Sequence, residues 1–200
     1  MTPKDARPGP ITATELMEQL ANDQEYQRAK AAREAELQEK VDAWSVAERP
    51  IVDDLVGAGV DVDSVWDLVN TAVPYPEALP VLVEHLERGG YPDRVTEGIA
   101  RSLAVKPANE YWERLRQLYL RAEGPDGTEG LAVALAGSAT RENLDALIAL
   151  LTLEERGDTR IHFIRPILRV GGARGRQVVE GLREDPVFGK EATARLARRK

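Results

Sequence analysis

The chain contains no cysteine and few aromatic residues, which make up 5% of its 200 positions. The absence of cysteine excludes disulfide bonds, thiolate metal ligands and cysteine nucleophiles. It also suits a reducing compartment, so we expect a cytoplasmic protein. Hydrophobic residues amount to 42%, and with so few aromatics the core must consist mainly of Leu, Val, Ile and Ala. That composition favours packed helices over a β-sandwich.

Long apolar runs are also missing. No stretch approaches the roughly 20 consecutive apolar residues that a bilayer-spanning helix needs. Met1 to Pro10 is polar and rich in proline, without an apolar segment of signal-peptide length. We therefore expect no membrane partner and a disordered tail over residues 1–11.

Histidine is scarce as well, because only His85 and His162 are present. Neither has a second histidine four residues away or a cysteine nearby, so the sequence contains no zinc-binding pattern. The segment that starts with Asp61 and Asp63 resembles the beginning of an EF-hand loop. However, Val65 and Trp66 occupy the positions where that loop requires a ligand and a glycine. No nucleophile motif or phosphate-binding loop is found, so we expect no cofactor and no enzymatic activity. A carboxylate pair assembled from distant segments stays open.

Charge is distributed unevenly along the chain. Residues 51–100 hold ten Asp/Glu against two Lys/Arg, whereas residues 151–200 hold twelve Lys/Arg against seven Asp/Glu. The difference has two interpretations. Solvated helix faces can differ in charge without consequence, or the polarity can steer a charged partner toward one end.

The positive signal is a repeat. After residue 75, two sets of helix-spaced apolar residues return at steps of 32 or 33 residues, with one final step of 28. This period predicts stacked pairs of helices. The first set is Leu82/Leu86, Leu115/Tyr119, Leu147/Leu151 and Val179/Leu182, and the second is Ile99/Leu103, Leu131/Leu135, Ile164/Leu168 and Ala192/Leu196.

Glycine and proline occur at the expected turns between these helices. The four pairs are predicted at 76–88 with 92–105, 109–122 with 127–138, 141–153 with 158–170, and 173–184 with 187–198. The first turn contains Gly89 and Gly90, and the third contains Gly157. Pro166 lies inside a predicted helix, where we expect it to cause a kink.

The segment before the repeats is different. Residues 12–49 are rich in good helix formers and predict one long helix with a polar middle, which we expect to project into solvent or pair loosely. Residues 50–75 predict two short capping helices, one starting at Ile51 and one capped by Asp63 or Ser64. Trp66 is expected to cover the open end of the repeat array.

The spacing and turns over about 76–198 resemble HEAT-type repeats. The resemblance implies an all-α fold with a short right-handed α-solenoid of about four HEAT-like hairpins over 76–200. It further implies a binding scaffold whose second helices line the concave face. We call the residues expected to face outward there the concave-face set. They are Arg94, Glu97, Arg101, Glu129, Val133, His162, Phe163, Arg165, Arg169 and Lys190.

The aromatic residue Phe163 and the two histidines have separate expected placements. Phe163 is either an exposed interface anchor or buried between the third and fourth repeats. His162 is expected on the concave face. His85, at the end of a predicted helix, is expected on the surface or as a helix C-cap.

The function expected from the sequence is therefore a non-enzymatic scaffold or adaptor that binds another protein, one with an acidic surface. An immunity or antitoxin-like inhibitor is one alternative. A HEAT-like enzyme or cofactor-handling protein, similar to DNA glycosylases or bilin lyases, is another. Nucleic acid is disfavoured because Glu97 and Glu129 occupy the repeat positions that match His162 and Lys190. The partner's identity and the oligomeric state stay open.

Overall fold

The computed structural model describes residues 11–197, and this part of the chain is helical without any strand. The all-α prediction is confirmed. The chain divides into two units, Met1–Ala43 and Trp44–Lys200, which are described separately. The tail expected over 1–11 lies outside the described residues except for Ile11. No helix in the described range is long and apolar enough to cross a membrane.

The first unit contains α1 (Ala13–Asn22) and the beginning of α2 (Gln24–Gly57). The single helix expected over 12–49 is interrupted at Asp23. The N–H of Asp23 donates to the carbonyl of Gln19, which ends α1, and its carboxylate accepts from the N–H groups of Glu25 and Tyr26, which begins α2. One Asp thus serves as the cap of both helices. No residue of α1 is buried.

α2 also continues through the expected boundary at residues 49 and 50. Pro50 lies inside the helix, which ends only at Gly57. Pro50 has no N–H to donate to the carbonyl of Val46, four residues earlier. Val46 is 68% exposed, so a water molecule can donate to that carbonyl instead. Ile51 and Leu55 are fully buried. The predicted first capping helix is therefore the last two turns of α2, which belong to the core of the second unit.

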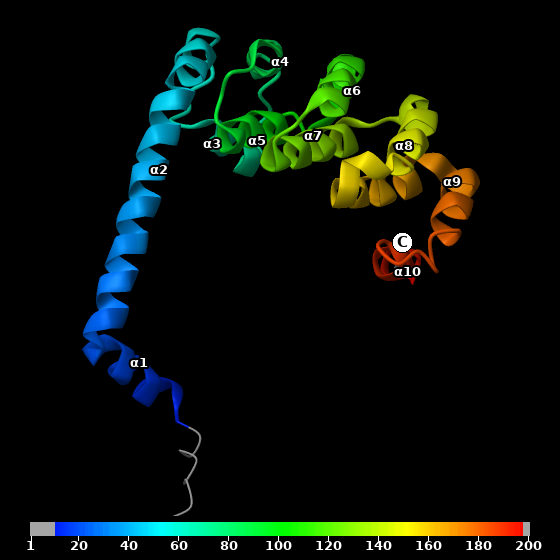
Figure 1. Ribbon diagram of the computed structural model, residues 1–200. Coiled ribbons are helices and arrows are strands. Elements are labelled where there is room, and N and C mark those ends of the chain that lie inside the picture. The colour runs from blue at the N-terminus through cyan, green and yellow to red at the C-terminus, as the bar shows by residue number, and fades with distance from the viewer. Residues whose placement is uncertain (1–10, 198–200) are drawn as a thin grey trace, which may run out of the picture. The chain divides into compact units, whose positions relative to one another are not determined.

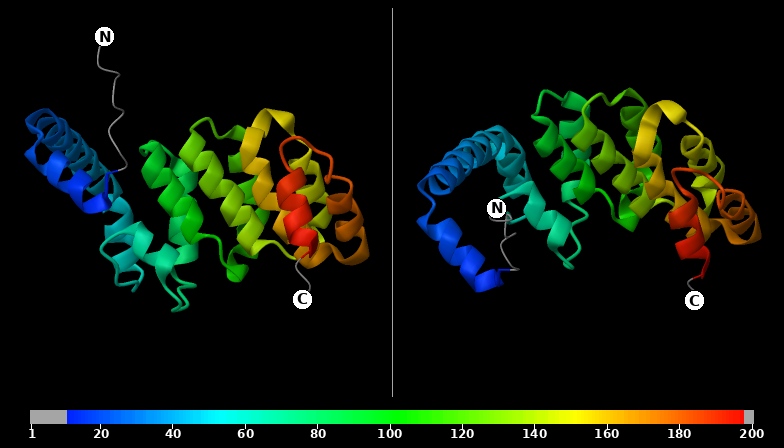
Figure 2. Two further views of the ribbon diagram at one scale, coloured as in Figure 1. Left: turned by 90° about the horizontal axis from the view of Figure 1, so that it is seen from below. Right: turned by 60° about the horizontal axis from the view of Figure 1, so that its bottom comes forward.

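In Figure 1, α4 (Ala78–Arg88) and α6 (Trp112–Arg121) lie above α5 (Asp93–Ser102) and α7 (Pro125–Ser138). Figure 2 shows neighbouring helices of this unit lying side by side. Most of the predicted helices are found within a few residues of their expected ends. The α-helices are α3 (Val65–Asn70), α4 (Ala78–Arg88), α5 (Asp93–Ser102), α6 (Trp112–Arg121), α7 (Pro125–Ser138), α8 (Leu144–Leu151), α9 (Ile164–Glu180) and α10 (Gly189–Ala197). Three 3-10 segments join them: η1 (Lys106–Tyr111), η2 (Arg141–Asn143) and η3 (Glu154–Phe163).

The repeated apolar positions form the core. Members of both sets are completely buried in one continuous cluster, whereas Leu168 and Leu182 are only partly buried against it. The fully buried members include Leu82, Ile99, Leu103, Leu115, Leu135, Leu147 and Ile164. The two periodic sets thus identified the faces of the helices that remove apolar surface from water.

Contacts between α5 and α7 recur at a fixed sequence distance. A Cβ atom added at Gly130 would come 2.8 Å from the carbonyl oxygen of Glu97, and one at Gly137 would meet the carbonyl of Ala104. Both contacts join residues that are 33 positions apart. The two helix backbones therefore approach more closely than larger side chains would permit.

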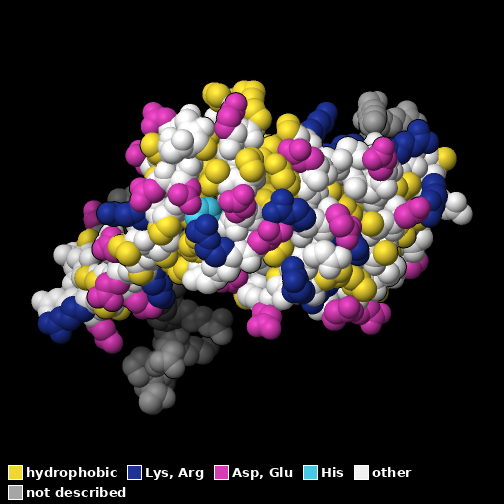
Figure 3. All heavy atoms as spheres, turned by 90° about the horizontal axis from the view of Figure 1, so that it is seen from above, with side chains coloured by type: hydrophobic (Ala, Val, Ile, Leu, Met, Phe, Trp, Pro, Cys, Tyr) yellow, Lys and Arg dark blue, Asp and Glu magenta, His cyan; other side chains and the backbone are white. Residues whose placement is uncertain are grey.

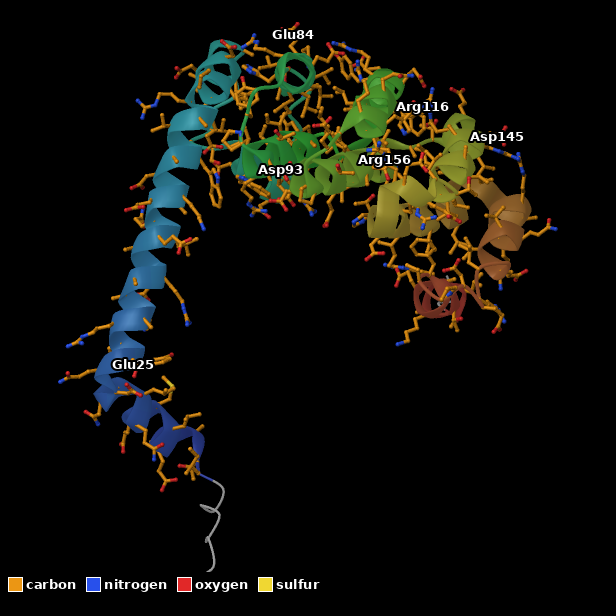
Figure 4. The ribbon with its side chains drawn as sticks, viewed as in Figure 1. Glu25, Glu84, Asp93, Arg116, Asp145 and Arg156 are labelled. Carbon is orange, nitrogen blue, oxygen red and sulfur yellow. The ribbon has the colours of Figure 1, made fainter. Side chains whose placement is uncertain are left out.

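Helix ends in this unit are capped by side chains from a neighbouring helical pair. The carboxylate of Asp93 accepts from the N–H groups of Asp126 and Gly127, both at 2.8 Å, at the start of α7. The guanidinium of Arg156 donates to the carbonyls of Tyr119, Leu120 and Ala122 at the end of α6. Both capping residues are labelled in Figure 4. Backbone groups that a helix leaves unpaired are thereby satisfied.

Turns and caps follow the predictions with one correction. Gly157 and Gly172 have a φ of 54°, a region that favours glycine, and both break helical geometry. Ser64, and not Asp63, caps α3. Pro166 causes no kink because it lies in the first turn of α9, where its missing N–H has no intrahelical partner to lose.

α3 packs against α5 at Gly98, where an added Cβ would lie 2.8 Å from Val65 and 2.9 Å from the Trp66 ring. Trp66 stays partly exposed, and the guanidinium of Arg94 lies 4.1 Å above its ring centroid. Trp66 therefore contacts the first helical pair, as expected, but an arginine from that pair shields its outer face.

Candidate binding groove

Four residues of the concave-face set form a connected series of ion pairs. Glu97 bonds to Arg94 and, at 2.6 Å, to Nε of Arg101, and the side chain of Glu97 is only 7% exposed. Arg101 also donates from Nη2 to Oε1 of Glu129 at 2.8 Å. The structure brings these four residues together. Their charges satisfy one another, however, so they offer little to a partner.

Phe163 is fully buried and packs edge-on against Tyr119, with ring centroids 5.5 Å apart. Of the two placements open from the sequence, burial is the one found, and Phe163 is not an exposed anchor. The reason is its position at the end of η3, where the side chain enters the core beside α6. Lys190 is exposed on α10 but does not line the groove described next.

A groove of about 620 Å³ lies beside four of the predicted residues, namely Val133, His162, Arg165 and Arg169. α7, η3, α9 and α10 all contribute to its walls. The complete lining is Ala104, Lys106, Val133, Ala136, Gly137, Ile161, His162, Arg165, Pro166, Arg169, Glu191 and Arg195. Four Lys/Arg residues therefore stand against one Glu, beside an apolar floor.

Local geometry explains why three of the predicted residues share this groove. η3 has about three residues per turn, so residues three apart lie on the same side. His162, near its end, is followed three positions later by Arg165, in the first turn of α9. Arg169 lies one α-helical turn further along the same flank.

The arginines of the groove differ in what they already bind. Arg169 donates from Nη2 to the carbonyls of Ala136 at 2.9 Å and Ala139 at 3.0 Å, which caps the end of α7. Arg195 pairs with Glu191 at 2.5 Å. Within residues 11–197, Arg165 has no hydrogen-bond or ion-pair partner.

Lys106 is the second groove cation without such a partner in the described range, and like Arg165 it is exposed. Lys106, Ile161, Glu191 and Arg195 were missed from the sequence. Lys106 comes from η1, outside the predicted helical pairs, so the repeat pattern carries no signal for it. Ile161, Glu191 and Arg195 lie in predicted second helices but were not among the positions chosen for the concave-face set.

His162 is the histidine that lines the groove. Its Nε2 lies 3.7 Å from Oε1 of Glu129, the same oxygen that accepts from Arg101. Burial lowers the pKa of His162 below 6.5; Glu129 opposes this shift and Arg101 adds to it. The neutral imidazole is thus favoured when the groove is empty.

His85, in contrast, is 1% exposed and lies in the core, which corrects its expected surface position. Its Nε2 is 3.0 Å from Asp54, and its Nδ1 is 2.5 Å from the hydroxyl of Tyr91. The imidazole thereby joins the last turns of α2 to α4 and the following loop. Both nitrogens of the buried imidazole therefore have hydrogen-bond partners.

The opposite side of the unit has a different character. Figure 3 looks onto the side of α4 and α6, where acidic and basic side chains are interspersed. A smaller hollow of about 320 Å³ near the Val73–Pro76 loop has an almost entirely apolar lining that includes Leu79 and Val105.

No group of three His, Asp or Glu residues that could hold a metal ion occurs in the described part of the chain.

Comparison with known proteins adds no further assignment: no family model, curated protein or solved structure matches this chain.

Proposed function

We propose that the chain is a non-enzymatic scaffold that binds an acidic segment of another protein in the groove between α7, η3, α9 and α10. The observation that carries the proposal is the pair of unpaired cations, Arg165 and Lys106, beside an apolar floor. Exposed cations with no internal partner are free to pair with carboxylates of a ligand.

The floor adds a second recognition element. Val133, Ile161 and Pro166 line the groove, and Ile161 is 37% exposed. An aliphatic side chain seated there removes apolar surface from water, while flanking carboxylates meet the cations at the walls. Protein–protein interfaces usually combine apolar contacts with polar ones in this way.

We further propose that residues 76–200 form a HEAT-like right-handed solenoid of about four hairpins, capped by the end of α2 and by α3. The contacts that support this arrangement recur one repeat apart, as between Gly130 and Glu97 or between Asp93 and Asp126. A stack in which each pair contacts its neighbours at a fixed offset is what a repeat array requires. In such an array the groove lies on the side that is lined by the second helix of each pair.

A protein carboxylate fits the groove better than a nucleic-acid backbone. A phosphate-binding surface wants basic residues spread along several repeats. Here Glu129 lies within reach of His162, and Glu191 lines the groove itself. Two unpaired cations suit a short acidic segment.

The test uses a pair of matched peptides and the full-length chain. One is a short blocked peptide in which aspartates flank a single leucine; in the other, asparagines replace the aspartates. Calorimetry at low salt should show binding of the aspartate peptide only. Lys106→Glu with Arg165→Glu should weaken it roughly tenfold or more, about 1.4 kcal/mol.

The matched control is Arg141→Glu with Arg183→Glu, which makes the same charge change at two exposed arginines outside the groove. It should leave the affinity for the aspartate peptide within about twofold, because neither arginine lines the groove and neither can form a direct ion pair with a peptide bound there. Equal binding of both peptides, or equal loss in both double variants, would refute the groove as an acidic-segment site. Displacement of the peptide by a single-stranded oligonucleotide at equal charge would favour nucleic acid instead.

A further inference from the structure

His162 is placed where a ligand carboxylate in the groove changes its surroundings. It lines the groove together with Arg165 and Lys106, and its side chain is 31% exposed. Glu129, whose Oε1 lies 3.7 Å from Nε2 of His162, is already bonded to Arg101 through that same oxygen. The empty groove therefore provides His162 with only a partly neutralised acceptor.

We propose that the groove takes up a proton at His162 when an acidic segment binds, so that the chain holds its partner more tightly at mildly acidic pH. The inference rests on the proposed function and names a regulation of that same site. It assigns His162 the role of a pH-sensitive contact residue for the ligand carboxylate.

The charges around His162 come from several elements. Those on the helices are Arg101 from α5, Glu129 from α7, Arg165 and Arg169 from α9, and Glu191 and Arg195 from α10. Lys106 comes from η1. Cations outnumber carboxylates, which opposes a further positive charge on the imidazole while no ligand is bound. Burial is the first cause of the lowered pKa of His162 in the free protein; Glu129 opposes this shift and Arg101 adds to it.

A ligand carboxylate reverses that balance. It neutralises the unpaired charges of Lys106 and Arg165 and offers the imidazolium an acceptor that Arg101 does not already hold. The pKa of His162 therefore rises in the complex. By linkage, whatever raises the pKa of His162 on binding also makes binding tighter when the proton is present.

The sign and range of the effect follow from the groups involved. A rise of one pKa unit corresponds to a tenfold higher affinity at a pH well below both pKa values. Aspartates of a ligand have an ordinary pKa near 3.9, so they stay ionised at pH 5.5. The only other histidine, His85, is buried against Asp54 and Tyr91 and does not line the groove.

Two measurements on the full-length chain test the inference. First, calorimetry with the aspartate peptide at pH 7.5 and pH 5.5 should show several-fold tighter binding at the lower pH, with net proton uptake detected from the buffer dependence of the heat. In His162→Gln the ratio of the two affinities should fall to near one. Second, the imidazole proton resonances give the pKa of both histidines, and only that of His162 should rise when peptide is added.

The outcomes separate this inference from the proposed function. Binding that depends on Arg165 but not on pH, with no change in the His162 resonance, refutes the proton uptake and leaves the acidic-segment groove standing. An equal pH effect in wild type and His162→Gln assigns the proton to another group and equally refutes it. Absence of Arg165-dependent binding at both pH values refutes the proposed function. Circular dichroism at pH 5.5 verifies that both proteins remain folded.

Discussion

Gly137 in α7 lies directly against the backbone of Ala104, two residues after the end of α5. A Cβ atom at position 137 would come closer to the Ala104 carbonyl oxygen than real Cβ atoms approach any atom. The neighbouring atom is backbone, which cannot rotate away as a side chain can. The spacing of α5 and α7 therefore depends on the absence of a side chain at this position.

Gly137→Ala should lower the free energy of unfolding by about 2 kcal/mol or more, because the added methyl group forces α5 and α7 apart. Chemical denaturation followed by circular dichroism measures the change. Gly57→Ala is the matched control: Gly57 has a helical position at the end of α2, and nothing lies within 4 Å of an added Cβ. That variant should be neutral or slightly stabilising. Equal stability of the two variants would contradict the close packing.

Leu147→Asp should destabilise the second unit by about 3 kcal/mol or more, because it places an unpaired carboxylate in the core. Leu147 is fully buried in α8, in the same cluster as Ile164. Ala149→Asp, two residues further in the same helix at an exposed position, is the control and should change stability little. A thermal melt that is unchanged by Leu147→Asp would show that the helix register is wrong.

Arg169 should contribute to stability, whereas Arg165 should contribute to ligand binding. Arg169→Gln removes a cap from the end of α7 and should cost about 1–3 kcal/mol of unfolding free energy, because the carbonyls of Ala136 and Ala139 lose a charged donor. Arg165→Gln removes no internal contact and should leave the melting temperature unchanged while weakening binding of the aspartate peptide. If Arg165→Gln lowered the melting temperature and Arg169→Gln weakened only peptide binding, the two assignments would have to be exchanged.

Deletion of residues 1–40 should leave the melting temperature of the remaining protein close to that of the full chain. α1 has no buried residue, and burial within α2 begins only at Glu48. Differential scanning calorimetry compares the two proteins. A much lower melting temperature, or aggregation of the shorter chain, would show that the first 40 residues contribute to the fold.

Helices and turns were predictable from the sequence because their signals are local. Gly89 and Gly90 end α4 with positive φ angles of 65° and 83°, which glycine alone adopts readily, and the 3-4 spacing around Leu82 or Ile99 fixes the buried face. The break at Asp23 was local too. It was missed because the good helix formers on both sides outweighed a single capping residue.

The roles of individual polar and aromatic residues were decided by tertiary structure. Arg165 and Arg169 look alike in sequence, and only the position of α7 makes one a cap and leaves the other free. His85 meets Asp54, 31 residues earlier, and Phe163 meets Tyr119, 44 residues earlier. The amino-acid sequence by itself determined the period, the helices and the buried faces, because backbone propensity and apolar spacing act within a turn or two. Which charges remain unpaired depended on which helices pack against one another, because pairing and burial are properties of residues brought together across the fold.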